Sequence, residues 1–223
     1  MTGPAVDWHA HVQRGASRWI DGRARLPTSP DERQRALTRM GNSAYAAGLA
    51  SLMSGDRDAA PEWLGRAAAA YRESWENAPP DSWGRPIGAV KARILAADWG
   101  GARRDAEWAL GAGAPEAGSP IGRYAATLAL CVLERYAEAR VHADALRVRD
   151  DFPADVADTL AFVAAEDVVG YVSGVESVLR SFETREAYLE DVPVADTVLV
   201  LQALAGRRGL AADLSSPLLP GTS

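Results

Sequence analysis

The sequence Gly55-Asp56-Arg57-Asp58-Ala59-Ala60 lies between two apolar helical runs and predicts a tight turn between two helices. Asp98-Trp99-Gly100-Gly101-Ala102 and Glu134-Arg135-Tyr136-Ala137-Glu138-Ala139 interrupt the chain in the same way, and each opens the next helix on a small residue. The closing alanines Ala60, Ala102 and Ala139 are 42 and 37 residues apart. A period of that size is typical of stacked helix pairs, so the turns predict an array of helical hairpins.

Helical periodicity continues on both sides of these turns. Ala60, Leu64, Ala67, Tyr71 and Trp75 follow one another at steps of three or four residues, which places them on one buried helical face. The same reasoning predicts eight to ten helices in antiparallel pairs. Their expected ranges are about 5–25, 31–54, 58–75, 83–98, 101–113, 120–132, 136–148, 154–168, 171–190 and 194–205.

The last expected helix differs from the others because it is apolar on almost every side, from Val194 to Ala205. A helix of that kind is covered all round, so we expect it to be the central or closing helix of the array. The chain is then one domain, 1–223, with an N-terminal helix and linker in 1–30, the hairpin array in 31–210 and a tail in 211–223. Gly48, in the middle of a long helix, predicts the close approach of a neighbouring helix.

The composition fits a helical binding protein and argues against several other classes. Alanine makes up much of the 48% hydrophobic content, and alanine favours close helix packing. The net charge of −6 and the pI of about 5.2 argue against nucleic-acid binding. We expect a cytoplasmic protein, because the chain has no signal peptide, no membrane-length apolar run and one cysteine, Cys131. Lys91 is the only lysine, which suggests the codon bias of a GC-rich genome.

The residues offer little catalytic chemistry. The three histidines are His9, His11 and His142, and their spacing favours polar surface positions over a metal site. No nucleophile elbow, zinc-protease helix or phosphate-binding loop occurs, and Gly111-Ala112-Gly113 follows a helix where a phosphate loop would follow a strand. We therefore expect no enzyme activity, no metal and no cofactor.

Seven tryptophans are many for this length, and five of them cluster between residues 63 and 108. The spacing of Trp75 assigns it to the core. Trp63 and Trp108 fall away from the apolar stripes of their helices, Trp83 adjoins a helix break and Trp99 lies in a turn. Because tryptophan is enriched in interface hot spots, these four are the candidate partner-binding residues. The alternative is that large rings fill gaps between alanine-rich helices.

The hairpin pattern resembles tetratricopeptide-like repeats, through Leu52, Gly55, Asp56, Ala59 and Ala60 and again through Leu133, Tyr136 and Ala139. The strict 34-residue period is absent.

The order of features is also similar to the immunity 49 family of bacterial polymorphic toxin systems. That resemblance rests on 44–52, the Trp75–Trp83 break, the last helix with its Arg-Arg-Gly-Leu end at 207–210, and Ser-Pro-Leu-Leu-Pro at 216–220. It implies an all-helical protein that binds and neutralises a cognate toxin, and it carries no catalytic residues.

The sequence thus predicts a non-enzymatic protein-binding module, and the resemblance implies the immunity type. The mild acidity is compatible with a basic toxin domain as partner, and equally with simple solubility. The alternatives are a helical-repeat adaptor or scaffold, and an enzyme or sensor with a small-molecule pocket between helix pairs. A deep closed pocket holding two or more acids or histidines would favour the last. The oligomeric state is not determined by the sequence.

Overall fold

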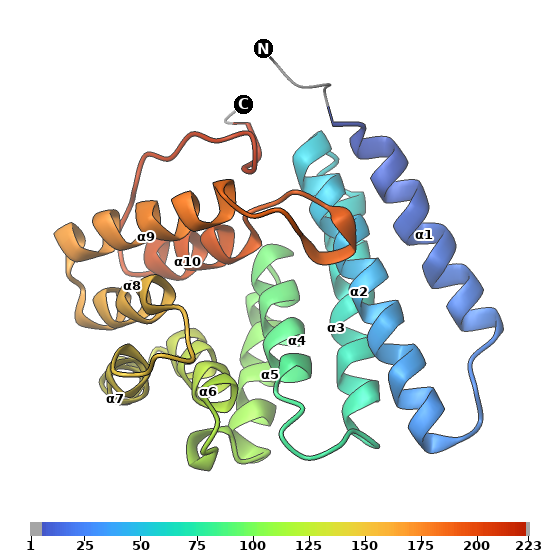
Figure 1. The fold of residues 1–223 in the computed structure, drawn as a ribbon, viewed down its shortest axis with the longest axis horizontal. Helices are drawn as coiled ribbons and strands as arrows, with labels where there is room; N and C mark the ends of the chain where they lie inside the picture. Colours follow the sequence, from blue (N-terminus) through green and yellow to red (C-terminus); the bar gives the residue numbers. More distant parts are fainter. Residues whose placement is uncertain (1–5, 222–223) are drawn as a thin grey trace.

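Ten α-helices and two short 3₁₀ turns form the described part of the computed structural model, residues 6–221, and no β-strand occurs there (Figure 1). The all-α prediction is confirmed. In chain order the helices are α1 (Trp8–Ala24), α2 (Pro30–Ser54), α3 (Ala59–Trp75), α4 (Gly84–Leu95), α5 (Trp99–Gly111), α6 (Pro120–Val132), α7 (Tyr136–Arg147), α8 (Ala154–Ala165), α9 (Val168–Glu183) and α10 (Asp196–Gly206).

Consecutive helices pack against each other from α1 to α9, as an array of hairpins requires. The helix axes turn along the array. In Figure 1, α1 to α5 stand side by side, whereas the axes of α8, α9 and α10 are turned crosswise to them. This rotation brings the C-terminal part of the chain back toward α2 and α4, and α10 packs on α4, α8 and α9.

One turn geometry closes four successive hairpins: α2–α3, α4–α5, α6–α7 and α8–α9. Each has one left-handed residue, with φ of 77° at Gly55, 54° at Ala97, 61° at Glu134 and 59° at Glu166. In each turn the next residue's N–H donates to the carbonyl five positions back, at 2.9 to 3.0 Å, as from Asp98 to Arg93. This is the Schellman motif, which satisfies carbonyls at the helix end. Three of the turns are those predicted from the sequence, and the fourth was not predicted.

Small residues set the distance between paired helices. Ala60, Ala102 and Ala139, each five positions after a left-handed residue, are fully buried. The close approach predicted at Gly48 is confirmed, because a Cβ atom there would lie 2.6 Å from Cγ of Leu64 on α3. An alanine at that position would collide with its neighbour, so the glycine allows α2 and α3 to pack closely.

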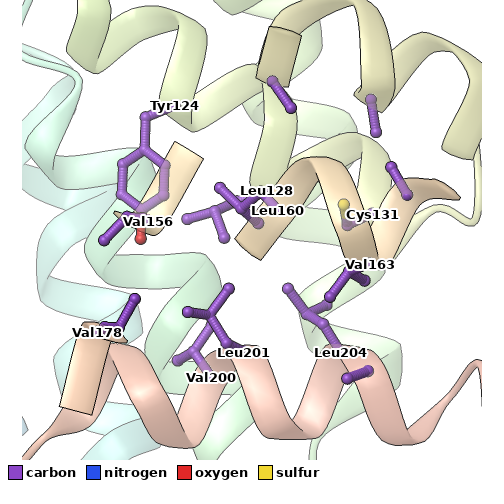
Figure 2. Close-up of a cluster of buried hydrophobic side chains, with 14 of the residues drawn as sticks. Tyr124, Leu128, Cys131, Val156, Leu160, Val163, Val178, Val200, Leu201 and Leu204 are labelled. Atoms are coloured by element: carbon purple, nitrogen blue, oxygen red, sulfur yellow. The ribbon is translucent and has the colours of Figure 1, made fainter. Parts of the chain in front are cut away.

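The apolar last helix lies at the centre of the largest hydrophobic cluster, as expected. Figure 2 shows Leu201 and Leu204 of α10 pointing toward Leu128 and Cys131 of α6 and Leu160 of α8. Only about 2% or less of each of these side chains is exposed. Burial raises the pKa of the Cys131 thiol to about 12, so this cysteine behaves as a small apolar side chain.

The tail packs on the body of the protein. Gly209, with φ of 71°, lies in the turn that follows α10. Leu219 is buried, and the Leu218 carbonyl accepts a hydrogen bond from the Ala195 N–H at 2.9 Å. Leu218 and Leu219 therefore hold the tail to the body of the protein.

Several predicted helix ends were wrong. The first helix was expected from residue 5, which lies outside the described residues. Helix α4 ends at Leu95, three residues before the predicted end. The expected helix over 171–190 runs from Val168 to Glu183, and the last helix begins at Asp196, two residues after the predicted Val194.

Residues 184–195 form a connecting segment that we call the strap, which crosses α2 (Figure 1). Val192 and Val194 are both buried against α2 residues such as Ala44 and Tyr45. Their alternation has the period of extended chain, which is the signal that the helical interpretation missed. Pro193 lies between them and cannot donate a backbone hydrogen bond, which also disfavours a helix there.

Candidate functional site

The four tryptophans predicted to bind a partner occupy three different environments. Trp63 on α3 lies under the Arg66 guanidinium, 4.3 Å from the ring centroid, and Trp99 on α5 lies under Arg207 at 4.5 Å. Both rings are partly exposed. Arginine over a tryptophan face is a favourable cation–π contact that holds both side chains in one geometry.

Trp108 belongs to a cluster of three tryptophans formed by α3, α5 and the chain before α4. Its ring meets Trp75 edge-on at 5.8 Å, and Trp75 contacts Trp83 at 5.2 Å. Trp108 and Trp75 remain partly exposed, whereas Trp83 is only 6% exposed and donates its indole N–H to Asp81. Trp83 thus fills a gap between helices, and its ring offers little surface to a partner. Trp75, predicted to be buried, lies at the edge of the core because α3 ends there.

Arg72 fixes the exposed side of this cluster. Its guanidinium lies 4.8 Å from the Trp108 centroid and donates to Asp105 Oδ1 at 2.7 Å. Asp105 is 4% exposed and also accepts a longer contact from Arg93. We call Arg72, Trp75 and Trp108 the Trp108 surface. It presents rigid aromatic and guanidinium groups, which are the chemical types that dominate protein interfaces.

The histidines are dispersed. His9 is exposed, His11 contacts Arg14, and His142 lies on α7 beside Arg123, away from both. Burial and the Arg123 charge lower the pKa of His142. Among residues 6–221, no group of three or more His, Cys, Asp or Glu side chains is placed to hold a metal ion.

A second site, which the sequence did not indicate, joins α2, α4 and α10 through three polar side chains. The Lys91 ammonium lies 2.5 Å from Oδ2 of Asp196 and donates to Thr197 Oγ1 at 3.1 Å. The Tyr45 hydroxyl donates to the same Asp196 oxygen at 2.9 Å. The Lys91 and Asp196 side chains are 12% and 18% exposed. We call Tyr45, Lys91 and Asp196 the polar clamp, because it fixes the start of α10 to two earlier helices.

The clamp is in its charged form. Burial by itself raises the pKa of Asp196, but attraction to Lys91 and hydrogen bonds from Lys91 and Tyr45 outweigh it and hold the pKa below its usual value. Burial likewise lowers the pKa of Lys91, and the Asp196 carboxylate raises it above normal. Burial and the adjacent carboxylate raise the pKa of Tyr45. The arrangement is an ion pair completed by a neutral hydroxyl donor.

Tyr71 packs beside the clamp between two helices. Its hydroxyl donates to Asn42 Oδ1 at 2.9 Å, and its ring lies between the backbones of Gly41 and Gly88. A Cβ at either glycine would come within 2.8 Å of a ring carbon. The two glycines therefore form a slot that fits the Tyr71 ring between α2 and α4.

These groups line an open pocket of about 350 Å³ between α2, α4 and the strap, which we call the Arg85 pocket. Its lining also includes Asp81, Arg85, Ile87 and Leu189. The pocket holds two acids, but Asp196 is bound in the clamp and Asp81 accepts from Trp83.

Three features of the sequence mark this site in retrospect. Lys91 is the only lysine among 24 basic residues. Asp196 is the only charged residue in the last helix. Tyr45 interrupts a run of small residues on α2. Each residue is unremarkable alone, and the three are joined only by the return of α10 to α4.

Comparison of the chain with models of protein families, with curated proteins and with solved structures finds no match. No helix among residues 6–221 combines the length and apolarity needed to cross a membrane.

Proposed function

We propose that this protein is a non-enzymatic protein-binding module of the immunity type, which binds a cognate toxin and neutralises it by covering its surface. The observation that carries the proposal is the Trp108 surface. Trp108 and Arg72 are partly exposed and are already fixed by Trp75 and Asp105, so a partner that packs on them orders few additional side chains. Pre-ordered contact groups reduce the entropic cost of binding.

The distribution of charge supports a basic partner. Residues 148–195, which include α8, α9 and the strap, carry eleven carboxylates and three arginines. Residues 8–54, which include α1 and α2, carry seven arginines and three carboxylates. Within this region, α8 and α9 lie at the opposite end of the array from α1 and α2, whereas the strap crosses α2. The carboxylates on α8 and α9 attract a basic domain during diffusional encounter. The net charge of −6 alone did not reveal this separation.

Co-expression with the products of neighbouring genes, followed by affinity capture, tests the proposal. We expect one neighbour to be retained, and Trp108→Ala to weaken its binding by about tenfold or more. Trp19→Ala is the matched control, since Trp19 is a partly buried tryptophan on α1 outside the Trp108 surface. Equal binding by both variants would remove Trp108 from the interface.

Toxicity separates an immunity protein from an adaptor or scaffold. Expression of the retained neighbour alone should arrest growth, and co-expression of this protein should restore it, less completely with Trp108→Ala. A neighbour that binds but is harmless to the cell would support the adaptor function and contradict neutralisation.

A further inference from the structure

Arg85 differs from the neighbouring arginines because its guanidinium is hydrogen-bonded to neutral side chains and not to a carboxylate. Its Nε donates to Ser74 Oγ at 3.0 Å and its Nη2 donates to Gln34 Oε1, and both partners are neutral and almost completely buried. No carboxylate lies within ion-pair distance of this guanidinium among residues 6–221. By contrast, Arg72 and Arg93 nearby both pair with Asp105.

The support for Arg85 extends behind the pocket. The Gln34 amide donates to Asp31 at 3.2 Å, and the Ser74 hydroxyl donates to the Tyr71 carbonyl at 2.8 Å. The guanidinium is therefore fixed from one side by two oriented side chains, while Arg85 also lines the pocket. Burial lowers the pKa of Arg85, as expected for a cation that has lost water and gained no counter-ion.

The remaining polar groups of the pocket offer donors. The Asn42 oxygen accepts from Tyr71, which leaves its amide nitrogen available to donate. Each of the two carboxylates already accepts a hydrogen bond: Asp196 accepts from Lys91 and Tyr45, and Asp81 accepts from the Trp83 indole. A fixed guanidinium with spare donors suits a planar acceptor that takes two parallel hydrogen bonds.

From these observations we propose that the Arg85 pocket binds a carboxylate that carries an apolar stem. The one pocket cation without a carboxylate partner matches one negative charge, and the nearby Asp81 carboxylate disfavours a dianion such as phosphate. Ile87 and Leu189 line the same pocket, and Leu189 is 43% exposed, so they offer apolar surface to the stem. The volume of about 350 Å³ is in the range of small-ligand sites.

Such a carboxylate has two sources, a free small acid or an acidic side chain of a bound protein. The inference goes beyond the proposed function and does not depend on it, because none of the residues that line the pocket belongs to the Trp108 surface.

NMR titration of the ¹⁵N-arginine-labelled protein tests the proposal directly. The Nε–Hε signal of Arg85 is assigned by its loss in Arg85→Lys. We expect butyrate to shift that signal saturably, with a dissociation constant on the order of millimolar, whereas isosteric butyramide and inorganic phosphate leave it nearly unchanged. A short acidic peptide with capped ends represents the protein-borne carboxylate.

Variants provide the second readout. Arg85→Gln should weaken butyrate or peptide binding by about tenfold or more. Arg39→Gln is the matched control, because Arg39 is an exposed arginine on α2 that lines the neighbouring pocket instead. Response to butyrate alone indicates a free acid, and response to the peptide alone indicates a protein ligand.

Three results would overturn the proposal. They are an Arg85 signal that neither probe shifts, an equal response to butyramide, and unchanged binding by Arg85→Gln. The wild-type titration decides the first two even if Arg85→Gln fails to fold.

Discussion

The strap and α10 are held differently at the two ends of the array. At the first hairpin, α2–α3, and the neighbouring α1 and α4, the contacts include charged groups: the polar clamp and an ion pair between Arg18 and Glu190. At the last hairpin, α8–α9, α10 packs through Leu201, Leu204 and other apolar side chains (Figure 2). An apolar contact tolerates small shifts, whereas an ion pair with an added hydrogen bond demands one register. The polar end therefore specifies where α10 begins, and the apolar end supplies most of the burial.

The largest expected effect comes from removing one partner of the clamp. Lys91→Met leaves Asp196 buried without its cation and should lower the free energy of unfolding by about 3 kcal/mol, measured by urea denaturation. The double variant Lys91→Met with Asp196→Asn removes both charges and should recover most of that loss. A double variant as unstable as the single one would show that the loss comes from packing and not from the unpaired carboxylate.

The pH dependence of stability should follow the clamp. Because the pKa of Asp196 is lower in the folded protein than in the unfolded chain, its contribution is complete above the ordinary aspartate pKa of about 4 and is lost as the pH falls through the folded value. The Lys91 contribution is complete below about pH 10 and is lost as the pH rises through its raised pKa.

Urea midpoints measured from pH 2 to pH 6 check the acid limb. We expect Asp196→Asn to flatten it. An acid limb of unchanged slope in that variant would assign the pH dependence to other carboxylates.

Removing the hydroxyl of Tyr45 or of Tyr171 should change the free energy of unfolding less than breaking the clamp does, and the two changes should have opposite signs. Tyr45→Phe removes a hydrogen bond to the ionised Asp196 and should cost about 2 kcal/mol. Tyr171, on α9, is fully buried, and its hydroxyl has no hydrogen-bond partner among residues 6–221. Tyr171→Phe should therefore raise the stability by up to about 1 kcal/mol. The same urea measurement compares them, and a loss in Tyr171→Phe would mean that a water molecule satisfies that hydroxyl.

Substitutions in the turns should change the free energy of unfolding least. Gly55 and Ala97 occupy the same left-handed position in two hairpins, and both are exposed. Gly55→Ala should cost about 1 kcal/mol, because a Cβ disfavours this conformation. Ala97→Gly should stabilise by about 0.5 kcal/mol, since relief of that strain exceeds the added entropy of the unfolded chain. Thermal unfolding of both variants checks that Gly55→Ala lowers the melting temperature and Ala97→Gly raises it.

Local signals predicted most of the helices correctly. The turn at Gly55 and the stripe through Leu64 and Tyr71 depend on neighbours within a few residues, so the sequence alone places them. The strap was missed because a short apolar run before a helix has the composition of a helix, and only its burial against α2 distinguishes it. The Trp108 surface was found in part: Trp108 was named, but Arg72, which fixes it, was not.

Sequence alone determined that this protein is an alanine-rich array of helical hairpins with an apolar closing helix, because turn chemistry and helical periodicity are local properties. The tertiary structure decided which polar residues meet. Lys91 and Asp196 are 105 positions apart, and their contact depends on the rotation accumulated over the intervening hairpins. That rotation comes from the packing of many side chains at once, so no single stretch of sequence encodes it.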